Sequence, residues 1–249
     1  MFRSAAALLR RRRAMIHLVL PAVAVGGMLA AYYSGLPHLA AIVAPRVEGV
    51  HRFAWREFGA LELSQLLLLA ALAAAAVRGA LHRANPGWLR ALAVLLAALA
   101  AFQFLEEADY GRPYYEWLSG TPAALDPETW SRNLHNRTLA DGRQLGQWLK
   151  EALDLVMIGW FFVFPLAWRG TQPGWLNRLR PSRWFAASVV LAFALGQTAR
   201  GLERAGLGVF DGVPGPLADN ASEFREWAMY WLLAWYTVDL FNPEHPEHE

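Results

Sequence analysis

Long apolar stretches alternate with polar connections along this chain, and their length is its strongest pattern. A helix that crosses a bilayer needs about 20 mostly apolar residues, and six stretches have such a length with few charges. They lie approximately at 14–33, 61–77, 88–106, 153–168, 184–201 and 224–241. No repeat of fixed period divides the chain. The pattern therefore predicts an all-α fold, a polytopic transmembrane bundle of about six helices that occupies residues 1–249 as one domain.

The connections differ between the two sides of the predicted bundle. On one side they are short and basic, around HRANPGW and RGTQPGWLNRLRPSR, with Pro-Gly and Pro-Ser turn signals. On the other side they run to roughly 27, 47 and 23 residues, and loops of such length usually carry function or contact a partner. The first long connection has apolar residues at helical spacing: Leu39, Ile42, Val43, Val47, Val50 and Phe53. This spacing predicts an amphipathic helix in the outer interface, which Pro45 breaks or starts.

Positive charge sets the expected orientation. The run Arg10 to Arg13 stands directly before the first apolar stretch, and basic residues are about twice as dense on the short-loop side as on the other. Under the positive-inside rule this predicts a bacterial inner-membrane protein with both termini in the cytoplasm. The first stretch exceeds the 7–15 apolar residues of a typical signal-peptide core, so we expect it to be retained as a helix.

The amino-acid composition limits the classes of protein and of functional site that this chain can form. Of 249 residues, 55% are hydrophobic and 18% are charged, as in membrane proteins. No cysteine is present, which excludes disulfides, iron–sulfur clusters, thiolate metal sites and cysteine nucleophiles. A metal ion would need His, Asp, Glu or other oxygen ligands. The formal charge is only +2 and no basic face forms, so the expected partner is the lipid bilayer and not a nucleic acid.

Five of the six predicted helices carry polar groups at the same, outer, level. A charge in hydrocarbon costs about 2.5–3.5 kcal/mol, so such groups are expected to face the bundle interior. Several recur at a spacing of three residues and therefore share a helix face. The set is Glu62, Ser64 and Gln65; Gln103, Glu106 and Glu107; Glu151 and Asp154; Gln197, Arg200 and Glu203; and Glu223, Arg225 and Glu226. Together they predict an acidic cup that opens outward, with Arg200 as its internal counter-charge.

Glu106 and Glu107 are the most informative members of this set. They lie in the stretch FQFLEEADYGRPYYEW, at the C-terminal end of a helix, where the helix dipole disfavours negative charge. One explanation is a plain boundary between the apolar helix and the interface. The favoured explanation is a specific partner, either Arg200, Arg112 or a metal ion.

His135 is the histidine with the most polar surroundings on the acidic side, within WSRNLHNRT. As a lone loop residue it is equally well explained as a solvated side chain. If its loop folds back over the cup, His135 joins Glu106 and Glu226 as ligands of a divalent metal. Alternatively, His135 serves with Glu106, Glu107 and Glu226 as a catalytic acid–base group.

The segment EEADYGRPYYEWLSGTP, followed by NLHN, resembles a group of uncharacterised bacterial polytopic membrane proteins. In that group a Glu-Glu pair ends a helix, and an aromatic-Gly pair, a Thr-Pro pair and Asn-Leu-His-Asn follow. The matching residues here are Glu106 and Glu107, Tyr110 and Gly111, Thr121 and Pro122, and 133–136. The final EFREWAMYWLLAWY is similar to the last helix of that group. This chain has Tyr110 where the group usually has Trp and Arg112 where it has Gln, and an arginine there can neutralise the glutamates. The resemblance implies a site at these residues and implies no reaction.

Three classes of function fit this pattern. Small residues such as Gly26, Gly27 and Ala30, or the stretch Ala71 to Ala76, allow close helix approach. Together with 12 tryptophans that offer partner contacts, they slightly favour an accessory or structural subunit of a membrane complex. The alternative is an outer-leaflet enzyme that acts on a lipid-linked or periplasmic substrate. A transporter is less expected, because ionisable groups are scarce in the middle of the spans and no repeat is present.

Overall fold

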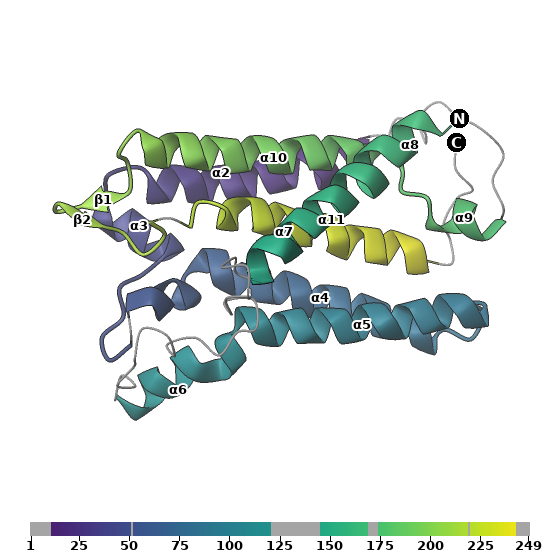
Figure 1. Cartoon of the computed structure of the whole chain (residues 1–249), viewed down its shortest axis with the longest axis horizontal. Coiled ribbons are helices and arrows are strands. Elements are labelled where there is room, and N and C mark those ends of the chain that lie inside the picture. The colour runs from purple at the N-terminus through teal and green to yellow at the C-terminus, as the bar shows by residue number, and fades with distance from the viewer. Residues whose placement is uncertain (1–10, 51, 121–144, 169–173, 219, 243–249) are drawn as a thin grey trace.

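A computed structural model describes most of the chain (Figure 1). The described residues are 11–50, 52–120, 145–168, 174–218 and 220–242. They are mostly helical, as the all-α prediction requires. Because residues 121–144 lie outside this description, so do His135 and the Thr-Pro and Asn-Leu-His-Asn motifs.

Four helices among the described residues are long and apolar enough to cross a membrane. They are Arg11–Tyr32, which includes η1 (Met15–Val19) and α2 (Leu20–Tyr32), then α4 (Ala60–Leu81), α5 (Gly87–Glu107) and α10 (Arg183–Arg204). At a rise of about 1.5 Å per residue, 21 or 22 residues reach across a hydrocarbon core of about 30 Å. These helices coincide with four of the six predicted stretches.

The other two predicted stretches are also helical, and charged residues lie near the start of each. One is covered by α7 (Leu145–Val156), which continues as η5 (Met157–Val163) and α8 (Phe164–Ala167). The other is covered by α11 (Glu223–Phe241). Each carries three charged residues within its first ten positions: Lys150, Glu151 and Asp154 in the first, and Glu223, Arg225 and Glu226 in the second.

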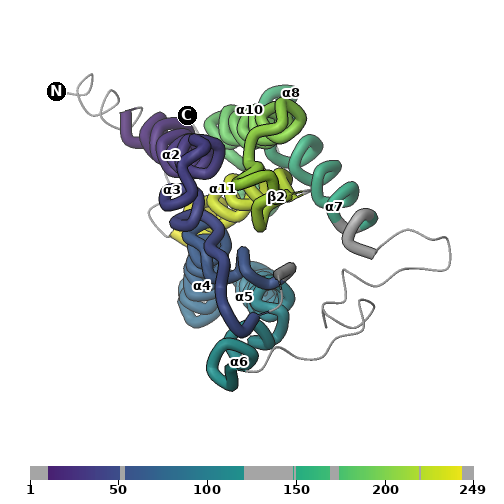
Figure 2. Tube along the Cα trace, turned by 90° about the vertical axis from the view of Figure 1, so that its left-hand side faces the viewer, coloured from purple at the N-terminus to yellow at the C-terminus, as the bar shows by residue number. Residues whose placement is uncertain are grey.

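The helices form two layers with α11 between them. The α4–α5 pair makes one layer, α2 and α10 make the other, and the helix from α7 to α8 lies across the face turned to the viewer in Figure 1. Seen from the end in Figure 2, α11 lies between α4 and the α2–α10 pair. Phe224, Leu232 and Leu240 of α11 are almost fully buried, on more than one side of the helix. An apolar surface of this width is typical of a central helix.

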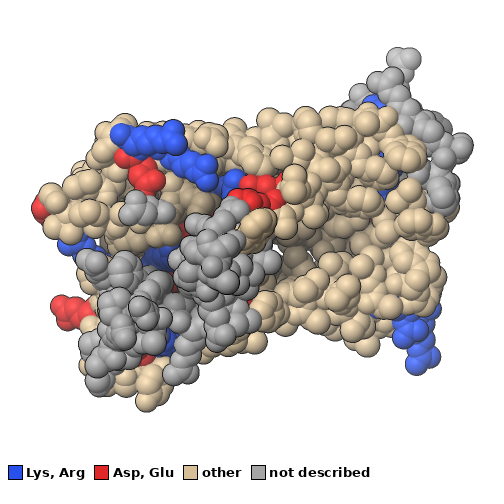
Figure 3. All heavy atoms as spheres, viewed as in Figure 1, with Lys and Arg blue, Asp and Glu red and all other residues tan. Residues whose placement is uncertain are grey.

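Shorter elements cap the two ends of the bundle. At one end are α3 (Pro37–Val43), η2 (Arg52–Phe58), η3 (Asp109–Gly111), α6 (Arg112–Ser119) and the hairpin of β1 (Val209–Phe210) and β2 (Val213–Pro214); at the other is α9 (Gly174–Leu179). In Figure 3, charged side chains concentrate toward the end with α3 and the hairpin, while the middle of this face is mostly uncharged.

The helix predicted for the first long connection is divided at Pro45 into two shorter helical segments. Helix α3 stops at Val43, and helical structure resumes only in η2. The reason is Pro45, because a proline forces the residue before it out of the helical region, and Ala44 is extended with φ −148° and ψ 92°. The break lets Gly59 approach Val43 closely: a Cβ on Gly59 would lie 1.8 Å from the Val43 carbonyl oxygen.

Close packing of α4 against α11 depends on Gly79. An added Cβ there would lie 2.4 Å from Cγ of Phe241. We therefore expect Gly79→Ala to destabilise the protein by about 1–3 kcal/mol, as overpacking does. Thermal unfolding in detergent measures the effect.

Gly26→Ala is the matched control, because a Cβ at Gly26 meets nothing within 4 Å. The second substitution Phe241→Ala should restore part of the stability lost in Gly79→Ala. Equal unfolding temperatures for the Gly79 and Gly26 variants would contradict the close packing.

Candidate functional site

Arg56 of η2 lies among three buried carboxylates from three elements. Its Nε is 3.5 Å from Oε1 of Glu57 and 3.5 Å from Oε1 of Glu62, and its Nη1 is 3.5 Å from Oε1 of Glu223. Glu62 comes from the first turn of α4 and Glu223 from the first turn of α11. A buried charge is tolerated when opposite charges surround it. Arg56 therefore joins the connecting segment to both helices.

Contacts between η2 and α6 hold Arg56 in this position. The ring centroids of Phe58 and Tyr114 are 5.2 Å apart, and those of Phe58 and Trp117 are 6.0 Å apart. The Tyr114 hydroxyl also donates a hydrogen bond to the Glu57 carbonyl oxygen at 3.4 Å. The aromatic contacts thus place Arg56 and Glu57 against the ends of the long helices.

Glu107 at the end of α5 is bound by hydrogen-bond donors. Tyr230 of α11 donates its hydroxyl proton to Oε1 of Glu107 at 2.6 Å, and Nε2 of Gln103 donates to the same oxygen at 2.6 Å. Nε2 of Gln103 is also 3.1 Å from the Tyr230 hydroxyl oxygen. These contacts supply the specific partners expected for a carboxylate in a position that the helix dipole disfavours. They also join α5 to α11.

Glu226 connects this site to α7. Its Oε1 is 2.7 Å from Nζ of Lys150, whose side chain is 44% exposed while that of Glu226 is 12% exposed. Glu226 also interacts electrostatically with Glu107 and Glu223. Through Lys150, the Glu226 carboxylate is therefore linked to the surface of the described part of the chain.

We call this group of seven ionisable residues the carboxylate cluster. Its members are Glu57, Glu62, Glu107, Glu223 and Glu226, with Arg56 and Lys150. The carboxylates outnumber the cations by three, so full ionisation would leave a large negative charge in a poorly hydrated site. Both burial and repulsion between like charges favour neutral carboxyl groups.

Gln65 marks an unmet hydrogen bond beside this cluster. The side chain is fully buried, and its Nε2 donates to the main-chain oxygen of Glu223 at 3.1 Å. Its Oε1 has no donor among the described residues. A proton on a neighbouring carboxyl group, or a water molecule, would supply that donor.

The ionisation of the η2 residues follows from their surroundings. Burial raises the pKa of Glu57 to about 8; Arg56 counteracts part of this, while Glu107 and Glu223 add to it. Burial alone would lower the pKa of Arg56, but Glu223, Glu62 and Glu57 more than offset this and hold it above its ordinary value. Arg56 thus remains charged, while Glu57 exchanges its proton near neutral pH.

The EEADYG motif forms a tight turn that separates its two glutamates. Asp109, Tyr110 and Gly111 have φ values of 43°, 53° and 78°. This left-handed conformation is unfavourable for a bulky residue such as Tyr110. The turn brings the Tyr110 hydroxyl back to donate a hydrogen bond to Oε1 of Glu106. Neighbouring residues of a helix point in different directions, so Glu107 enters the cluster while Glu106 binds the turn.

Arg200 and Arg112 were the counter-charges that the sequence suggested. Arg112 pairs within α6, with its Nε 3.1 Å from Oε1 of Glu116. Arg200 lies on α10, and no ion pair between it and a carboxylate occurs among the described residues. Arg56 and Lys150 offset part of the negative charge of the cluster.

The predicted site residues are brought together only in part. Glu107 and Glu226 belong to one cluster, Glu106 lies beside it, and His135 is outside the described residues. Within the described ranges, no three His, Asp or Glu side chains are arranged to hold a metal ion. In the cluster, the guanidinium of Arg56 occupies the position between three carboxylates.

Sequence reasoning missed four members of this site: Arg56, Glu57, Lys150 and Tyr230. One signal was available, because Tyr230 follows Glu223 and Glu226 at positions i, i+3 and i+7 and so shares their helix face. Arg56 and Glu57 come directly after the apolar residues whose spacing predicted an amphipathic helix in the outer interface. Nothing in their spacing indicated a turn toward the bundle.

The raised pKa of Glu57 predicts a pH dependence of stability. The folded value is about 8, above the ordinary 4.5 of an unfolded glutamate, so the folded state retains a proton that the unfolded state releases between these values. Raising the pH from 5 to about 8 should therefore lower the free energy of unfolding, by at most about 1.4 kcal/mol per pH unit for this one group. Glu57→Gln should weaken the decrease.

Unfolding temperatures measured in detergent at several pH values test this expectation. Glu48→Gln is the control, because Glu48 is exposed on the preceding segment. An identical pH profile for wild type and Glu57→Gln would refute the assignment.

Comparison with known proteins does not identify the chain. No protein-family model, curated protein or solved structure matches it. The functional conclusion therefore rests on the geometry of the carboxylate cluster.

Proposed function

We propose that this chain is a six-span protein of the bacterial inner membrane whose carboxylate cluster is an acid–base site at the outer face. The observation that carries the proposal is the excess of three carboxylates over cations in a cluster whose Glu57, Glu62 and Glu223 are buried. An ionisable group in such an environment is a functional candidate by default.

Charge balance supports proton exchange at this site. Carboxyl groups that cannot all ionise together share protons, and a group that titrates near the working pH both accepts and donates a proton efficiently. Glu57 has this property, with a pKa of about 8. The Lys150–Glu226 pair offers a route to the surface, since the Lys150 side chain is partly exposed.

The reaction class that fits best is acid–base catalysis by an outer-leaflet membrane enzyme. Glu107 and Glu226 are the proposed catalytic pair within the cluster, with His135 contributed by the long loop and Glu106 positioned beside them. The substrate would be lipid-linked or periplasmic, because the cluster lies at the end of the bundle that the positive-inside rule places outside.

The proposed six crossings agree with the direction of the helices. The start of α2 and the end of α11 lie at the same end of the molecule in Figure 1, as an even number of crossings requires. The basic connections flank that end, which supports a cytoplasmic location for both termini.

An accessory subunit of a membrane complex is the second candidate. Helix α5 packs mainly against α4. Leu95, Leu99 and Phe102 on α5 are 55%, 54% and 44% exposed, so they are available to lipid or to another membrane subunit. Purification in a mild detergent distinguishes the candidates, because an isolated monomer that retains its cellular role would contradict the subunit proposal.

The acid–base proposal predicts protonated carboxyl groups at neutral pH. Infrared spectra of the purified protein should show the C=O stretch of protonated carboxyls at pH 7, and this band should decline as the pH rises. Glu107→Gln and Glu62→Gln should each reduce the band, because each removes one excess carboxyl.

Glu116→Gln is the matched control for this experiment. Glu116 is buried, at 2% exposure, much as Glu62 is at 3%, but has its own cation in Arg112. Its replacement should leave the band unchanged. A wild-type protein without the band at pH 7 would disprove the acid–base site.

A metal-dependent form of the proposed enzyme makes a separate prediction. If Glu106, His135 and Glu226 hold a divalent metal, elemental analysis of the purified protein should find it bound in near-stoichiometric amount. Glu106→Gln and His135→Ala should each lose most of it. Equal metal content in wild type and both variants would rule out this ligand set.

A further inference from the structure

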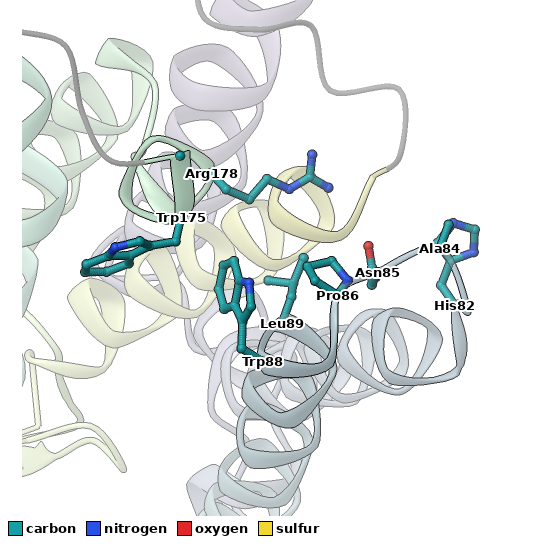
Figure 4. Close-up of a pocket in the computed structure, with 9 residues that line it drawn as sticks. His82, Ala84, Asn85, Pro86, Trp88, Leu89, Trp175 and Arg178 are labelled. Carbon is teal, nitrogen blue, oxygen red and sulfur yellow. The ribbon is translucent and has the colours of Figure 1, made fainter.

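A cavity of about 440 Å³ lies at the opposite end of the bundle from the carboxylate cluster. One wall is formed by His82 and Asn85 of the turn between α4 and α5 and by Trp88 and Leu89 at the start of α5. The other wall is α9, with Trp175 and Arg178 (Figure 4). Its volume lies within the range of small-molecule sites, about 300–1,000 Å³.

Two tryptophans make one part of this cavity apolar and aromatic. Trp88 and Trp175 come from opposite walls and lie near one another in Figure 4, and they are 42% and 56% exposed. Leu89 beside them is fully buried. Large indoles that remain exposed at the end of apolar helices are typical of the boundary between hydrocarbon and headgroups.

Arg178 gives the cavity its charge. Its side chain extends from α9 across the space toward Pro86 and Asn85 in Figure 4. Its Nη2 donates to the main-chain oxygen of Asn242 at 3.3 Å, which uses one of its five N–H donors. No lining residue is Asp or Glu. The described lining is therefore net positive, with donors available for an anion.

Local hydrogen bonds fix the opposite wall. Nδ2 of Asn85 donates to the Gly79 carbonyl oxygen at 2.9 Å, and Nε of Arg90 donates to the Ala80 carbonyl oxygen at 2.9 Å. These bonds occupy the last carbonyl groups of α4 and hold the turn in place.

We propose that this cavity binds an anionic phospholipid by its phosphate headgroup. The phosphate lies at Arg178, which is suited to planar, bidentate recognition of phosphate oxygens. The glycerol and the first acyl carbons lie against Trp88 and Trp175. The combination of an aromatic wall and a single cationic side matches an amphipathic ligand better than free inorganic phosphate.

Native mass spectrometry of the full-length protein in a nonionic detergent tests the proposal. The protein is titrated with phosphatidylglycerol, with phosphatidylcholine of the same acyl chains, and with inorganic phosphate. Phosphatidylglycerol should be retained several-fold more than phosphatidylcholine. Arg178→Gln should lower phosphatidylglycerol retention by about tenfold, which corresponds to about 1.4 kcal/mol. Trp175→Ala should lower retention of both lipids, because the indole contacts the part that they share.

Arg180→Gln is the matched control, since Arg180 lies beside α9 but does not line the cavity. It should retain phosphatidylglycerol as wild type does. Thermal unfolding verifies that each variant is folded, and Arg178→Lys, which keeps the positive charge, should recover part of the binding. Equal retention of both lipids, an equal loss in Arg180→Gln, or no loss in Arg178→Gln would overturn the proposal. Displacement of the lipid by inorganic phosphate at equal concentration would assign the cavity to the free anion instead.

Discussion

The ion pairs of Arg56 are the interaction on which the organisation of this protein depends. One guanidinium contacts a carboxylate from its own segment, one from α4 and one from α11. Removal of this partly buried cation would take one ion-pair partner from each of three carboxylates, and loss of one partner of such a pair is destabilising. The same contacts hold the long connection before α4 against the helix ends. The Arg56 side chain thus both holds the connection before α4 in place and offsets part of the charge of the carboxylates.

Helix α11 connects the Arg56 ion pairs to the other helices of the bundle through side-chain contacts along its length. Its first turns carry Glu223 and Glu226, which contact η2 and α7, and Tyr230 one turn later binds Glu107 of α5. At its far end Phe241 packs directly on Gly79 of α4. The helix therefore needs polar residues near its start and small partners near its end.

The sequence predicted at which end of the helices the site lies, but it predicted only some of the residues that form it. Glu62, Gln65, Glu107, Glu223 and Glu226 were expected at one membrane level because helix ends and charge positions can be counted along the chain. Arg56 and Lys150 were not expected, because they lie outside the apolar stretches and their partners are far away in sequence. Arg200 had the right spacing and level but lies on α10, and spacing within a helix says nothing about which helices are neighbours.

The sequence by itself determined the apolar helices, because the length and polarity of a membrane span are local properties. It also determined the break at Pro45, since a proline acts on the backbone of its immediate neighbour. Only the tertiary structure decided that Glu107 and not Glu106 enters the cluster, and that Arg56 pairs with three of its carboxylates. Those outcomes depend on the rotation of α5 and the order of the helices around α11. Both are set by packing between residues more than a hundred positions apart, such as Glu107 and Tyr230.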